Sequence, residues 1–121
     1  MSITHLGFYR ELPYGEPEGG SIRDAEPLDP SRKVRVVAYL RDAPVLAASG
    51  KLVTDFFSGD PLGTFDLHTD GHWIWYSDLA HYVEHHDSAL PDDFAAVAAQ
   101  SSPPDLSTDE LMAIAQEIRE G

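Results

Sequence analysis

An Asp-Gly turn between two alternating segments is the feature that most restricts the fold of this chain. Residues 63–68, which alternate apolar and polar side chains, and the aromatic segment 72–76 lie on either side of Thr69-Asp70-Gly71. Asp-Gly in this setting is a strong signal for a β-hairpin, because glycine adopts a positive φ without a steric penalty. The sequence therefore predicts an antiparallel pair of strands near the middle of the chain.

Strand-like patterns also precede the hairpin. We predict strands at residues 3–10, 33–40 and 45–48, because apolar side chains recur there with a period of two. Residues 33–40 are the clearest case. Residues 50–58 favour a short helix or turn, because their apolar side chains fall at helical spacing. Those four side chains are Leu52, Val53, Phe56 and Phe57.

A long connection and three helices complete the predicted elements. Residues 11–31 hold four prolines, three glycines and several acids, which is typical of a loop. Helices are predicted from 77 or 78 to about 86, from about 90 onward, and after Ser107. In the last helix Ser107 and Glu110 form a capping box, and the apolar side chains are expected to face inward. Those side chains are Leu111, Ile114, Ala115 and Ile118.

Strands first and helices last predict an α+β fold. We expect a mainly antiparallel sheet of four or five strands in the N-terminal two-thirds. Two or three C-terminal helices are expected to pack on one of its faces. A length of 121 residues predicts one domain spanning residues 1–121, with the loop at 11–31 inside it.

Composition narrows the classes of protein further. The chain has no cysteine, which excludes disulfides, cysteine-ligated zinc and a cysteine nucleophile. The first residues show no basic segment followed by an apolar run, and no apolar run approaches the roughly 20 residues that span a bilayer. We therefore expect a cytoplasmic protein.

Charge is the most informative bulk property. The chain carries 21 acidic and 8 basic residues, and residues 77–121 hold ten acids against a single arginine. The negative electrostatic potential of such a chain repels nucleic acid and anionic membranes, and it attracts basic proteins. The alternative is that the acidity serves only solubility.

One segment matches a catalytic motif. His81-Tyr82-Val83-Glu84-His85 fits the H-x-x-E-H pattern of inverted zinc peptidases. A helical wheel, however, places His81, Glu84 and His85 opposite the apolar stripe, facing solvent. The remaining chain is also short for a substrate groove, so we expect no enzyme activity.

A histidine metal site is a further alternative. Five of the six histidines lie between residues 68 and 86, and a hairpin and a helix can bring imidazoles together. If a metal binds, the expected ligands are His68, His72, His81 and His85. Exposed polar histidines are the commoner arrangement, so we predict no metal and no cofactor.

Residues 69–94 resemble a known group of proteins. The segment reads Thr-Asp-Gly-x-Trp-x-Trp-x-Ser-Asp-Leu-x-x-Tyr-Val-Glu, followed by Leu-Pro-x-x-Phe. It is similar to part of small bacterial, often actinobacterial, proteins of the immunity type, which are associated with polymorphic toxins. The resemblance implies a cytoplasmic, non-enzymatic protein that neutralises a cognate toxin.

These observations favour an acidic binding protein, an immunity or inhibitor protein whose partner is a basic protein. Neither nucleic acid nor membrane is an expected partner, and the protein is expected to be a monomer or a homodimer. A homodimeric accessory protein and a histidine metal-binding protein remain alternatives. The expected partner-binding residues are helical acids and nearby aromatic side chains. They are Asp78, Glu84, Asp87, Asp92, Asp93, Tyr76 and Trp75.

Overall fold

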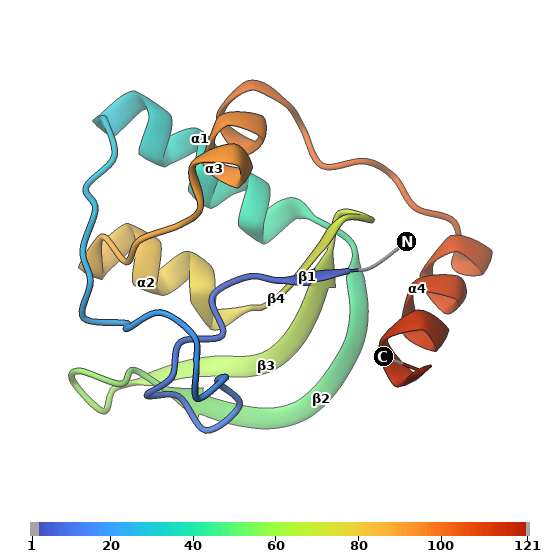
Figure 1. Ribbon diagram of the computed structural model, residues 1–121, viewed down its shortest axis with the longest axis horizontal. Helices are drawn as coiled ribbons and strands as arrows, with labels where there is room; N and C mark the ends of the chain where they lie inside the picture. The colour runs from blue at the N-terminus through green and yellow to red at the C-terminus, as the bar shows by residue number, and fades with distance from the viewer. Residues whose placement is uncertain (1–2, 121) are drawn as a thin grey trace.

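The computed structural model describes residues 3–120, apart from the side chains of residues 49, 50, 119 and 120. Its described sheet has four strands in the order β1-β4-β3-β2 (Figure 1). The short strand β1 runs parallel to β4, and the other pairs are antiparallel. The strands are β1 (Thr4–His5), β2 (Val45–Thr54), β3 (Pro61–Thr69) and β4 (Trp73–Tyr76).

The predicted hairpin is confirmed as β3 and β4. Its turn is closed by Asp70, whose Oδ1 accepts hydrogen bonds from the amides of His72 and Trp73 at 3.0 and 2.9 Å. Gly71 has a φ of 96°, the left-handed region that glycine tolerates. Asp70 Oδ2 also accepts a 2.7 Å bond from the Tyr39 hydroxyl, which ties the turn to a helix.

The predicted strand at 33–40 is wrong, because these residues form helix α1 (Pro30–Asp42). Asp29 caps the helix, and Pro30 occupies its first turn. The buried side chains are Val36, Val37, Tyr39 and Leu40, whereas Val34 is 70% exposed. Packing of this helical face has overridden the strand preference of the valines.

Two other boundaries differ from expectation. The short helix or turn predicted at 50–58 is in fact the end of β2, which continues to Thr54, followed by a turn. The strand predicted at 3–10 is limited to Thr4–His5. The loop that follows is ordered by Glu11, whose carboxylate accepts hydrogen bonds from the Ser21 hydroxyl and the Ile22 amide.

Helices α2 (Asp78–His86) and α3 (Asp92–Gln100) form where predicted, and α1 packs against both of them. The buried core lies where these three helices meet the sheet. Trp75 of β4 is fully buried there, and its indole N–H donates to the Leu40 carbonyl at 3.0 Å. The rings of Phe94 and Tyr39 pack around it. The fold is therefore α+β, with one helix before the main strands and three after them.

Helix α4 (Thr108–Glu120) stands apart from the other three helices in Figure 1. Its capping box is confirmed, since Ser107 and Glu110 exchange two 3.1 Å hydrogen bonds. The expectation that its apolar face joins the core is wrong, because Leu111, Ile114, Ala115 and Ile118 are only half-buried. None of the described residues of α4 belongs to the buried core.

Candidate functional site

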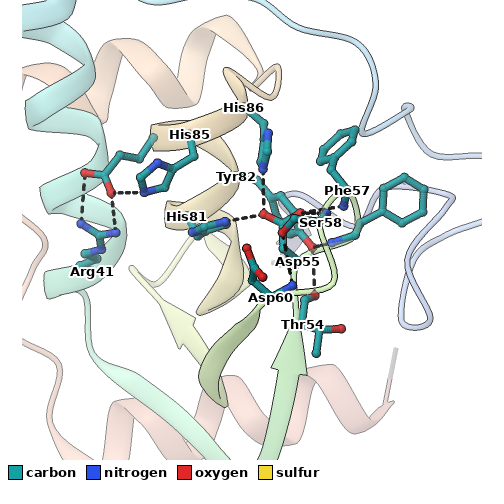
Figure 2. Close-up of polar contacts among 12 residues, drawn as sticks. Arg41, Thr54, Asp55, Phe57, Ser58, Asp60, His81, Tyr82, His85 and His86 are labelled. Carbon is teal, nitrogen blue, oxygen red and sulfur yellow. Dashed lines mark hydrogen bonds and ion pairs between the residues drawn. The ribbon is translucent and has the colours of Figure 1, made fainter.

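Two imidazoles converge on one buried carboxylate. Nε2 of His81 lies 2.6 Å from Asp55 Oδ2, and Nε2 of His86 lies 2.7 Å from the same oxygen. Figure 2 shows both rings pointing from α2 toward the turn after β2. Asp55 is 4% exposed, whereas the histidine side chains are 26% and 27% exposed. The site therefore joins a buried acid to two rings that solvent reaches.

The turn after β2 fixes the position of Asp55. The amides of Phe57 and Ser58 donate to its Oδ1 at 2.6 and 3.1 Å (Figure 2). Its own amide donates to the Asp60 carbonyl, and its carbonyl accepts from the Gly59 amide, both at 2.8 Å. Gly59 has a φ of 77°, which the tight turn requires. One carboxylate oxygen is thus held by the backbone, and the other faces the histidines.

Helix α2 positions the two imidazoles. His81 lies in the middle of the helix and His86 is its last residue, directly before Asp87, which ends the helix with a φ of 52°. Between them the Tyr82 hydroxyl accepts a 2.8 Å bond from the Phe56 amide and lies 3.4 Å from the Thr54 carbonyl. This tyrosine holds the segment around Asp55 against the helix.

The hydrogen bonds keep Asp55 ionised. Burial by itself raises the pKa of its carboxyl group, but bonds from His86, His81 and the amides of Phe57 and Ser58 outweigh it and hold the pKa well below the ordinary value. Burial also raises the pKa of Tyr82 to about 12, so its hydroxyl stays protonated at neutral pH. The arrangement is an anion facing two imidazoles.

A second buried carboxylate lies at the other end of α2. Asp78 is 3% exposed, and its Oδ2 accepts a 2.6 Å bond from the Tyr14 hydroxyl. Its other oxygen has no hydrogen-bond partner among the described residues. Burial raises the pKa of this carboxyl group, and the bond from Tyr14 offsets only part of the increase.

The histidine set expected from the sequence does not assemble. His68 is buried, with Nδ1 2.9 Å from the Ala43 carbonyl, and His72 is exposed at the hairpin turn. Of the four expected ligands only His81 takes part, while Asp55 and His86 were missed. Asp55 precedes a segment that contains Gly59, and this local pattern predicts a turn. No local pattern indicated that it meets α2.

The H-x-x-E-H segment is split between two environments. Glu84 pairs with Arg41 at 3.0 Å and with His85 at 3.1 Å, near the protein surface. The expectation that His81 faces solvent is wrong, because its ring turns toward buried Asp55. His81 and Glu84 therefore serve different contacts and do not share one metal-binding face.

The expected partner-binding residues also separate. Trp75 and Asp78 are buried in the fold, so neither is available to a partner. Tyr76 is half-buried and stacks on Phe65 with ring centroids 4.0 Å apart. Glu84 is paired with Arg41, as described above, and Asp87 is paired with Lys33 at 2.8 Å. Asp92 and Asp93 are exposed at the start of α3.

An acidic surface nevertheless forms where residues 24–29 lie beside residues 87–93. The Glu26 amide donates to the Asp87 carbonyl at 2.8 Å, and the Ala89 amide donates to the Asp24 carbonyl at 3.1 Å. A surface hollow here is lined by Glu26, Asp29 and Asp92, together with Arg32. We call these two segments the acidic surface. Its acidic residues are Asp24, Glu26, Asp29, Asp87, Asp92 and Asp93.

Comparisons of the chain with protein-family models, with curated proteins and with solved structures yield no match. Among the described residues, the helices are all too short or too polar to cross a lipid bilayer.

Proposed function

We propose that this chain is a non-enzymatic acidic binding protein of the immunity or inhibitor type, which binds a basic partner protein such as a toxin. The observation that supports the proposal is the acidic surface, where six carboxylates from two distant parts of the sequence lie on adjacent segments. Arg32 and Lys33 at the start of α1 oppose them locally, and Lys33 is paired with Asp87.

The hollow within this surface suits a basic side chain. Three of its lining residues, Glu26, Asp29 and Asp92, are exposed acids. Carboxylates grouped around a concave surface bind an arginine or lysine through charge-assisted hydrogen bonds. Pro27, Leu28 and Leu90 add apolar surface for the stem of such a side chain.

The net charge of −13 favours the same kind of partner. A strongly negative protein steers a basic partner toward it over a range set by the Debye length, about 10 Å at 0.1 M salt. The association is therefore expected to be rapid at low salt and to weaken as salt is added.

The test begins with capture of a partner from the native host on the immobilised full chain at low salt. The affinity of the captured protein is then measured for two triple variants that lose the same charge. Glu26→Gln/Asp92→Asn/Asp93→Asn alters the acidic surface, and Asp42→Asn/Asp60→Asn/Asp105→Asn alters exposed acids elsewhere.

We expect the first variant to weaken binding at least about tenfold and the control to change it less than about threefold, since 1.4 kcal/mol corresponds to a factor of ten. Equal losses in the two variants would show that bulk charge alone drives the association. Failure to retain any basic protein would contradict the proposal.

A further inference from the structure

We propose that Asp55, His81 and His86 form a binding site for one divalent transition-metal ion of the zinc type. The site uses none of the acidic surface, so it does not depend on the proposed function. It stands on the convergence of three side chains from two elements that are distant in the sequence, the end of β2 and helix α2.

The donor atoms match that class of ion. Zinc is bound by imidazole nitrogen at about 2.0–2.1 Å and by carboxylate oxygen at about 2.0–2.2 Å, whereas magnesium and calcium prefer sets made of oxygen alone. The two imidazole nitrogens and the carboxylate oxygen all lie within 4.8 Å of one another. A single ion between them can contact all three once the atoms take up tetrahedral spacing.

The required movement is small. Tetrahedral bonds of these lengths separate neighbouring ligand atoms by about 3.3 Å. The present separations of 2.6 and 2.7 Å are hydrogen-bond distances, so each imidazole has to retreat by about 0.6–0.7 Å. Both rings are partly exposed near the end of α2, and a small side-chain rotation provides this space.

The carboxylate is already oriented for one metal bond. Its Oδ1 is occupied by the amides of Phe57 and Ser58, which leaves Oδ2 as the oxygen that faces the imidazoles (Figure 2). Hydrogen bonds of this kind to a ligating group fix its direction and are a regular part of metal sites. The bond from the Phe56 amide to the Tyr82 hydroxyl holds the turn at the correct distance from α2.

The surroundings favour a cation with an open coordination position. The C-terminal end of a helix carries partial negative charge, and His86 is the last residue of α2. Three protein ligands leave a fourth position for water or another ligand. Solvent reaches the site, since about a quarter of each histidine side chain is exposed. The Phe57 ring lies 4.5 Å from the His86 ring and covers one side.

The competing interpretation is a triad held only by hydrogen bonds, in which the two imidazoles donate to the carboxylate. This interpretation accounts for the same distances, but it predicts that added metal does not bind. Titration of the protein with metal therefore separates the two.

The experiment uses the full chain without an affinity tag, after dialysis against a chelator. Zn²⁺ is titrated by calorimetry, and Mg²⁺ and Ca²⁺ are titrated as ions of the wrong class. The variants are His81→Gln, His86→Gln and Asp55→Asn, with exposed His72→Gln as the matched control. Circular dichroism establishes that each variant is folded, and imidazole NMR signals provide a second measurement on the unmodified chain.

We expect one equivalent of Zn²⁺ to bind, to raise the melting temperature and to shift the Nε2 signals of His81 and His86. Each ligand substitution should weaken binding by more than about tenfold, because loss of a group that merely hydrogen-bonds to a ligand already costs about tenfold to a hundredfold. His72→Gln should bind as the unmodified chain does. The proposal is overturned if Zn²⁺ fails to bind, if it binds equally in the ligand variants, or if the shifted signals belong to other histidines.

Discussion

Each end of α2 lies beside a buried carboxylate, and the pKa values of the two carboxyl groups shift in opposite directions. Asp78, the first residue of α2, is 3% exposed. Asp55, which contacts His81 and His86 of the same helix, is 4% exposed. Burial raises the pKa of both groups, yet the pKa of Asp78 ends above its ordinary value and that of Asp55 ends below it. Both carboxyl groups are almost closed to solvent, but Asp78 lies deeper among protein atoms than Asp55, so burial opposes ionisation more strongly at Asp78.

Hydrogen-bond donors also contribute to the difference in pKa. Asp55 accepts from two backbone amides and two imidazoles, whereas Asp78 accepts from the hydroxyl of Tyr14. Bonds to the charged form offset the cost of removing it from water, and the bonds at Asp78 are too few to do so. The comparison teaches that depth of burial and the number of donors together set the direction in which the pKa of a buried acid shifts in this fold. Four predictions test it, from the largest expected effect to the smallest.

Asp55→Ala is expected to have the largest effect. Four donors would lose their acceptor, and we expect the free energy of unfolding to fall by about 3 kcal/mol in the presence of a chelator. Urea denaturation measures the change. Asp60→Ala, at an exposed position of the same turn, is the matched control and should cost less than about 0.5 kcal/mol. Similar losses in the two variants would contradict the assigned role of Asp55.

Tyr14→Phe should have the next largest effect. It removes the hydroxyl that donates to Asp78, and we expect a loss of about 1–2 kcal/mol in the free energy of unfolding, measured in the same way. Tyr76→Phe is the control, because the Tyr76 ring lies 4.5 Å from Tyr14 but its hydroxyl enters none of the described hydrogen bonds. A smaller loss for Tyr14→Phe than for Tyr76→Phe would be inconsistent with the pairing.

Asp78→Asn should act in the opposite direction at neutral pH. The amide oxygen still accepts from Tyr14, and the buried charge is gone, so we expect the free energy of unfolding to rise by about 1 kcal/mol.

The sign follows from proton linkage. Because the folded pKa of Asp78 is raised, its stabilising contribution is complete below the unfolded pKa and is lost as the pH rises through the folded pKa. The advantage of Asp78→Asn should therefore shrink on acidification, as measured by urea denaturation across the pH range. An advantage that grows at low pH would show that Asp78 is not the buried acid described.

His85→Ala should have the smallest effect. This residue belongs to the same end of α2 as His86, but its side chain is 56% exposed. It pairs with Glu84 near the surface, and its ring centroid lies 4.6 Å from that of His81. Exposed ion pairs contribute between about 0 and 1 kcal/mol, so we expect a change below about 0.5 kcal/mol. A thermal unfolding curve that falls as far as that of Asp55→Ala would remove the distinction between the two faces of the helix.

Local signals predicted the elements whose backbone conformation is set by neighbouring residues. The Asp70-Gly71 hairpin and the Ser107–Glu110 capping box are examples, because each is closed by side chains a few residues apart. The same kind of signal is present at α1, where Asp29 and Pro30 mark a helix start, but the alternation of valines in this segment favours a strand.

Helix α4 shows the limit of periodicity. Its apolar stripe is genuine, but a stripe states only which side of a helix is apolar, and the side chains of Leu111 and Ile114 remain half-buried outside the core. Where a helix docks depends on the surface offered by the remaining elements.

The sequence by itself determined the α+β class, the central hairpin, the acidic character and the positions of α2 and α3, because these follow from composition and from contacts between near neighbours. Only the tertiary structure decided that Asp55 meets His81 and His86, 26 and 31 residues away, and that Asp78 and Trp75 face inward. The physical reason is that burial and long-range hydrogen bonds depend on how elements pack together, and no residue carries that information in its local pattern.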